Sequence, residues 1–150
     1  MANDLKYTSP FYLYRGRVCD VIDGDTLDIE FDYGFGLRQV QRIRLYDIDT
    51  PETRTRNKRE KTHGLDTKWF VEELFDYDVG VLVESIKDKS GKYGRPLSRV
   101  LVLDDNYFMT QRKHDYVTTK LYYVAGYEGW DLAELLKANG FEKRETYDND

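Results

Sequence analysis

Residues 26–32 read TLDIEFD, a stretch in which apolar and acidic residues alternate strictly. Because successive side chains of a strand point to opposite faces, this alternation predicts a half-buried β-strand. Outward from it, residues 12–22 and 39–47 also have the composition of strands, and Asp23-Gly24 supplies a turn between the first two. Three such strands in a row predict an antiparallel meander.

The remaining chain alternates between helical and strand patterns. A polar, basic stretch over residues 53–63 predicts a surface loop, and the spacing of Leu65, Trp69, Phe70 and Leu74 predicts a helix over 64–75 with one apolar stripe. Strands are predicted over 79–86 and 97–103, a tyrosine-rich hairpin over 107–124 and a short helix over 130–139. This order predicts a mainly β protein: a five-stranded OB-fold-type barrel with two α-helices and an extra β-hairpin.

Length and composition set bounds on the class of protein. A chain of 150 residues with 40% hydrophobic and 34% charged residues has the composition of one globular domain and not of a disordered chain. No stretch approaches the roughly 20 apolar residues of a membrane span, and residues 1–10 lack an apolar core of signal-peptide length, so we expect a cytoplasmic protein without membrane partners. With a net charge of -5, any contact with a polyanion must be local.

The first candidate site is Asp23-Gly24-Asp25-Thr26, which places two carboxylates in one turn. Carboxylate oxygens are the ligands that hard cations prefer. Asp-Gly is also a common turn former, and as an isolated motif this one is more simply explained by turn chemistry.

A second candidate is the segment RIRLYDIDTPE over residues 42–52, an arginine-bearing strand that runs into a carboxylate-rich exit stopped by proline. Alternation places Arg42 and Arg44 on one face of the strand, with Asp49 and Glu52 at its end. A metal or a phosphate would bring these charges together. A surface ion-pair network explains the isolated segment equally well.

A third candidate is the turn GKYGRP over residues 91–96, which presents Lys92 and Arg95 on either side of Tyr93. Guanidinium groups bind phosphate oxygens bidentately, although exposed basic turns are common without any ligand. Between the second and third candidates, residues 54–61 carry five basic residues and one acidic residue. This basic segment would suit a phosphodiester backbone, and a solvated charge run is the competing interpretation.

Two other residue types favour structural roles. The tyrosines of residues 107–127 would be able to stack on bases, but aromatic-rich strands more often serve packing. His63 and His114 have no second histidine at ligand spacing, which disfavours a histidine-based metal nuclease.

Together the three motifs resemble the staphylococcal nuclease (thermonuclease) family, whose pattern is a DGDT hairpin, an arginine strand ending in D-[TA]-P-E and a later Y-G-R turn. The resemblance covers about residues 18–102 and implies one SNase-like domain over 1–150, with a motif-bearing core at about 12–104 and an additional hairpin and helix over 105–140. It implies one divalent cation, typically calcium, on the carboxylates of Asp25 and Asp49 and the backbone carbonyl of Thr50.

The resemblance also implies roles for the remaining charged positions. Glu52 would activate the attacking water, and Arg44 and Arg95 would grip the phosphate. Substrate-binding candidates of a second tier are Asp23, Lys92 and Tyr93. The implied protein is a monomeric, calcium-dependent endonuclease that hydrolyses phosphodiester bonds of DNA or RNA.

Two other function classes fit parts of the sequence: a catalytically silent module that binds nucleic acid or protein, and an acidic protein that mimics nucleic acid. Intact carboxylates and arginines favour the enzyme over the silent module, and the mimic would bind its partner without metal dependence. The chain departs from the family pattern at Asp47, where the archetype has an apolar residue. Either the strand end is reshaped there, or a further carboxylate approaches the metal.

Overall fold

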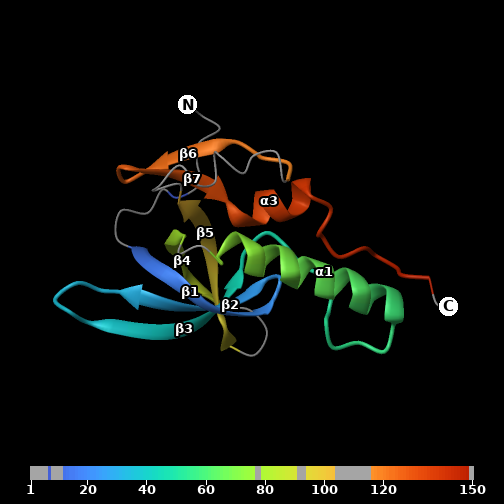
Figure 1. Ribbon diagram of the computed structural model, residues 1–150. Helices are drawn as coiled ribbons and strands as arrows, with labels where there is room; N and C mark the ends of the chain where they lie inside the picture. The colour runs from blue at the N-terminus through green and yellow to red at the C-terminus, as the bar shows by residue number, and fades with distance from the viewer. Residues whose placement is uncertain (1–6, 8–11, 77–78, 91–93, 104–115, 149–150) are drawn as a thin grey trace.

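The computed structural model describes residues 7, 12–76, 79–90, 94–103 and 116–148. A small barrel lies beside a long helix, and a hairpin and a short helix lie above the barrel in the view of Figure 1. The elements in order are β1 (Leu13–Asp23), β2 (Thr26–Asp32), β3 (Arg38–Leu45), α1 (Lys58–Leu74), β4 (Gly80–Ser90), β5 (Pro96–Leu103), β6 (Leu121–Val124), β7 (Tyr127–Asp131) and α3 (Leu132–Ala138).

Five strands form a closed barrel, as predicted. They are hydrogen-bonded in the order β3-β2-β1-β4-β5, and a short parallel pairing of β3 with β5, at Arg44↔Leu97 and Leu45↔Ser98, closes the ring. Strand β1 pairs with both β2 and β4, and its register shifts between Val18 and Asp20 and again between Val21 and Asp23. Such irregularities bend a strand and allow one long strand to turn a barrel corner.

The alternating stretch over 26–32 is strand β2, and its apolar side chains point into the barrel. Leu27 and Ile29 are fully buried and Phe31 is 5% exposed, whereas Asp28, Glu30 and Asp32 are partly or fully exposed. Valines of β4 and β5 complete the same core. The side-chain period of two is therefore what sets the register of the barrel wall.

Helix α1 begins six residues earlier than predicted, so the expected loop over 53–63 is wrong from Lys58 onward. The cause is a cap: the Asn57 side chain accepts hydrogen bonds from the backbone N–H groups of Arg59 and Glu60, which satisfies donors that a polar helix start would otherwise leave unpaired.

The apolar stripe predicted for α1 is only half right. Phe70 and Leu74 face the core, but Leu65 is 48% exposed and Trp69 is 63% exposed. Two small residues, Gly64 and Thr67, are buried instead, because Gly64 packs on the backbone of Glu52 and Thr67 lies against Gly24 in the β1–β2 turn. None of the helices in the described ranges is long and apolar enough to span a membrane.

The extra hairpin lies later in the chain than predicted. Strands β6 and β7 turn at Ala125-Gly126, both with positive φ, and β7 adds to the barrel through β5. The part of the expected hairpin over 107–115 lies outside the described residues. The predicted helix over 130–139 begins only at Leu132, since Trp130 and Asp131 belong to β7 and the Asp131 side chain caps the helix.

Two strand boundaries also differ from the prediction. Strand β3 ends at Leu45 and not at Asp47, which has a φ of 69° and lies in a turn. Strand β4 continues to Ser90, beyond the predicted end at residue 86. The segment containing Lys92 and Tyr93 lies outside the described residues.

Gly129 allows β7 to approach β5 closely, and a side chain there should destabilise the protein. A Cβ atom on Gly129 would be 2.2 Å from the carbonyl oxygen of Val102, a backbone atom that cannot turn aside. We expect Gly129→Ala to lower the free energy of unfolding by about 1 to 3 kcal/mol, the usual cost of overpacking. Urea unfolding would measure this, with Glu128→Ala as the control; equal stability of Gly129→Ala and the control would contradict the close approach.

Candidate active site

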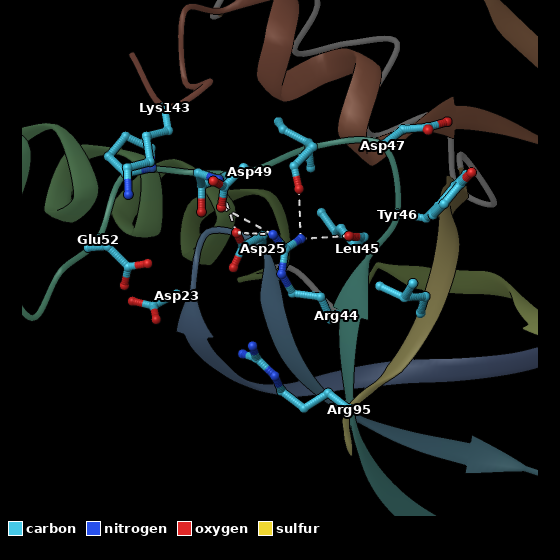
Figure 2. Close-up of a pocket in the computed structure, with 14 residues that line it drawn as sticks. Asp23, Asp25, Arg44, Leu45, Tyr46, Asp47, Asp49, Glu52, Arg95 and Lys143 are labelled. Atoms are coloured by element: carbon cyan, nitrogen blue, oxygen red, sulfur yellow. Dashed lines mark hydrogen bonds and ion pairs between the residues drawn. The ribbon is translucent and has the colours of Figure 1, made fainter. Parts of the chain in front are cut away.

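A pocket of about 530 Å³ gathers seven of the nine site residues expected from the sequence. The two others, Lys92 and Tyr93, lie outside the described residues. The pocket is formed by the β1–β2 turn, the end of β3 with the segment after it, the start of β5 and the C-terminal segment (Figure 2). The expected residues that line it are Asp23, Asp25, Arg44, Asp49, Thr50, Glu52 and Arg95.

Asp25 is the most buried carboxylate of this pocket. Its residue is 7% exposed, Oδ1 accepts a hydrogen bond from the Thr26 hydroxyl at 3.1 Å, and Oδ2 accepts one from the Thr50 N–H at 3.0 Å. The backbone also holds it, because Leu45 N–H donates to the Asp25 carbonyl at 2.8 Å. The carboxylate is thus fixed between the β1–β2 turn and the segment after β3.

Arg44 joins the two carboxylates that the family pattern assigns to the metal. Its Nη2 lies 3.4 Å from Asp25 Oδ2 and 3.1 Å from Asp49 Oδ1. Its Nη1 donates to the carbonyl oxygens of Leu45 at 2.7 Å and Ile48 at 2.6 Å. The guanidinium therefore holds the turn after β3 in place as well as pairing with the acids. By contrast, Arg42 lies on the outer surface, where it pairs with Asp28 at 2.8 Å.

Arg95 reaches the pocket from the position just before β5, on the side opposite Asp49 (Figure 2). Its Nη1 donates to the Thr26 hydroxyl at 2.9 Å, and this hydroxyl in turn donates to Asp25. The barrel closure between β3 and β5 brings Arg95 and Arg44 to one pocket from distant parts of the sequence.

Glu52 lies in an acidic environment. Partial withdrawal from water raises the pKa of its carboxyl group; the nearby Lys143 opposes this shift, and the charges of Asp23, Asp25 and Asp49 add to it. A carboxylate whose pKa is raised toward the working pH is a better proton acceptor than an ordinary one.

The backbone at Glu52 is held by helix α1. Its N–H donates to Glu60 Oε2 at 3.0 Å, and Gly64 packs directly against it, since a Cβ atom on Gly64 would be 2.5 Å from the Glu52 carbonyl oxygen. Only a residue without a side chain allows this approach. Gly64, where the sequence predicted the helix to begin, therefore supports the pocket by allowing α1 to approach the Glu52 backbone.

Asp23 and Asp47 lie on opposite sides of the pocket. Asp23 accepts a hydrogen bond from the Thr53 hydroxyl and lies near Glu52, whereas the Asp47 side chain points away from the other acids (Figure 2). This orientation favours the first of the two alternatives for Asp47, a reshaped strand end, over a further carboxylate near a metal.

The charge of the pocket suits a divalent cation. Among the described residues that line it, four carboxylates other than Asp47 lie with three cationic groups, a formal excess of one negative charge, to which the outward-pointing Asp47 adds at the edge. The donors are oxygens, as hard cations require, and Asp25 and Asp49 converge on one guanidinium nitrogen. In the described ranges no group of three or more acidic, histidine or cysteine side chains is arranged to hold an ion by itself. Backbone oxygen and water would have to complete the shell.

Lys143 lines the pocket and was missed by sequence reasoning. It lies in the charged last residues, for which no periodicity or motif exists. Its place depends on a contact between the C-terminal segment and the segment after β3, because its N–H donates to the Asp49 carbonyl at 2.8 Å. No short-range signal would have found it.

Comparison with known proteins agrees with the family resemblance of the three motifs. The family model described as staphylococcal nuclease homologue matches residues 42–125. A thermonuclease of Staphylococcus intermedius is 31% identical over 68% of this chain and 57% of its own length. Uncharacterized proteins of Methanocaldococcus jannaschii and Bacillus anthracis are each 31% identical, over 62% and 57% of this chain. The matches cover only 51% and 38% of those two relatives, so the chain spans about half the length of the curated relatives it matches.

Proposed function

This chain belongs to the staphylococcal nuclease family, and from this premise we propose that it is a metal-dependent nuclease that hydrolyses phosphodiester bonds of DNA or RNA. One observation carries the proposal: a single pocket holds two arginines, two carboxylates that share one guanidinium nitrogen, and a third carboxylate with a raised pKa. Each of these groups has a task in phosphodiester hydrolysis.

Arg44 and Arg95 are the groups proposed to bind the phosphate. Attack on a phosphodiester builds negative charge on the phosphoryl oxygens, and fixed guanidinium groups stabilise that charge where it develops. Both side chains are already held by hydrogen bonds, Arg44 to two carbonyl oxygens and Arg95 to Thr26. Little reorganisation is then needed at the moment of reaction.

Asp25, Asp49 and the backbone carbonyl of Thr50 are the proposed holders of one divalent cation, with calcium the preferred candidate. When bound, the cation would supply further positive charge beside the phosphate. The pocket's formal excess of negative charge supports this assignment.

Glu52 is the proposed general base. It would take a proton from a water molecule whose oxygen attacks phosphorus, while the bond from phosphorus to the leaving oxygen breaks. The basic segment over 54–61, next to the pocket in the chain, would track the backbone of the nucleic acid; Arg54 and Arg56 are exposed. A local basic surface of this kind would have to replace the global positive charge that the chain lacks.

Removal of divalent cations should abolish cleavage. The test is digestion of single-stranded and double-stranded DNA and of RNA with calcium, with magnesium and with a chelator, using the parent and Arg95→Ala. We expect cleavage by the parent that is lost with chelator and restored by excess calcium, and a loss of about 10²- to 10³-fold in Arg95→Ala. Cleavage that persists in chelator would refute the proposed mechanism. Binding without cleavage of any substrate would support the silent module instead.

A further inference from the structure

The C-terminal segment, residues 141–148, runs beside helix α1 (Figure 1) and contributes Lys143 to the lining of the candidate pocket. This segment lies outside residues 42–125, the part of the chain that the family model matches. None of the three sequence motifs includes this segment, so Lys143 adds a group to the pocket that those motifs do not account for.

The segment is anchored to α1 on both sides of Lys143. Before it, the Phe141 ring packs on Phe70 with ring centroids 4.9 Å apart, and His63 Nε2 lies 2.7 Å from the Gly140 carbonyl oxygen. After it, the Tyr147 hydroxyl lies 2.7 Å from His63 Nδ1. The Asn57 side chain donates to the Tyr147 carbonyl at 3.2 Å. Lys143 is thus presented from a fixed backbone.

The ammonium group of Lys143 is linked to the backbone of Glu52 through one carboxylate. Its Nζ lies 3.3 Å from Glu60 Oε2, and this same oxygen accepts the hydrogen bond from Glu52 N–H at 3.0 Å. The Glu60 side chain is 12% exposed and that of Lys143 is 33% exposed, so the pair is partly shielded from water. Figure 2 shows Lys143 on the same side of the pocket as Glu52.

Lys143 remains a cation in this environment. Burial by itself lowers the pKa of the ammonium group. The hydrogen bond and charge of Glu60, together with the charges of Asp49 and Glu52, raise it by more, so the net shift is upward. A permanent positive charge beside Glu60 fixes the direction of that carboxylate. Without it, Glu60 would be able to rotate into solvent, and Glu52 N–H would lose its acceptor.

We propose that Lys143 is a positioning residue for the reaction: it holds Glu60 in the rotamer that accepts Glu52 N–H, and so sets where the Glu52 carboxylate lies. The inference rests on the proposed function, since it assigns Lys143 a task in placing the general base. Its backbone N–H adds to this task by holding the Asp49 carbonyl, at the other end of the same short segment.

The activity test compares Lys143→Met, Lys143→Arg and the control Lys137→Met, an exposed lysine of α3. Displacement of a reacting group by a fraction of an ångström is costly, so we expect Lys143→Met to lower kcat by about tenfold with little change in KM or in unfolding temperature. Lys143→Arg should restore kcat, because it keeps the charge, and the control should match the parent. A raised KM with unchanged kcat would overturn the proposal, since Lys143 would then bind substrate; an unchanged kcat and KM would overturn it too.

A second measurement does not depend on cleavage. Amide hydrogen exchange, followed by NMR, reports directly on the hydrogen bond of Glu52 N–H. We expect exchange of this amide to be about tenfold faster in Lys143→Met and in Glu60→Ala, which removes the acceptor, with the amides of β2 unchanged. If the parent cleaves nothing, the proposed function fails but this experiment still decides the positioning role. Equal exchange in the parent and Lys143→Met would remove that role, whatever the activity.

Discussion

Replacing Glu52 with glutamine is expected to lower kcat by about 10²- to 10⁴-fold, the range that general acid–base catalysis contributes. Glutamine keeps the shape of the side chain and leaves the backbone hydrogen bond to Glu60 intact. It cannot accept the proton of the attacking water. KM and the unfolding temperature should change little.

The measurement is single-turnover cleavage of a short DNA or RNA with saturating calcium. Glu72→Gln is the matched control, the same substitution on an exposed position of α1. Calcium binding should be measured on both variants by calorimetry, so that loss of the ion is not mistaken for loss of the base. Cleavage by Glu52→Gln at the parent's rate would exclude Glu52 as the base.

Replacing Arg44 with alanine is expected to cost both stability and activity. It removes the partner of Asp25, a carboxylate that is 7% exposed, and leaves the carbonyl oxygens of Leu45 and Ile48 without these hydrogen bonds. Loss of one member of such a group should lower the free energy of unfolding by about 2 to 4 kcal/mol. Cleavage should fall by about 10²-fold or more, because a charge-stabilising donor is lost.

Two further variants separate these effects. Arg42→Ala removes the neighbouring outward arginine of β3, whose pair with Asp28 is solvent-exposed, and should unfold at nearly the same temperature as the parent. Arg44→Lys keeps the charge but not the planar fork, so it should retain more stability than activity. The assignment of Arg44 would be refuted if Arg44→Ala and Arg42→Ala behaved alike in both measurements.

How much of the structure could be predicted from the sequence depends on how far apart in the sequence the interacting residues lie. Strand β2 was evident because its alternation is a property of seven consecutive residues. A known family pattern links segments that spacing alone cannot link, and five of the residues it named line one pocket: Asp25, Arg44, Asp49, Glu52 and Arg95. Their catalytic and metal-binding roles stay predictions until the variants are measured.

The misses share a physical cause. The start of α1 was missed because the Asn57 side chain caps a helix in a segment whose polar composition predicted a loop. Its inward face was misjudged at Leu65 and Trp69. The helix packs through Gly64 on the Glu52 backbone and through Thr67 on the β1–β2 turn, and close approach matters more there than hydrophobicity. Lys143 was missed because its neighbours come from residues far away in sequence.

The parallel pairing of β3 with β5 has a consequence for how the protein is made. This pairing joins segments on either side of α1, and loop-closure entropy must be overcome before such a contact forms. During synthesis, a chain that has emerged only as far as β4 already carries Asp25, Arg44, Asp49 and Glu52, but neither Arg95 nor the strand that closes the ring. The pocket is therefore completed late, and a nascent chain on the ribosome, surrounded by RNA, does not yet hold an assembled site.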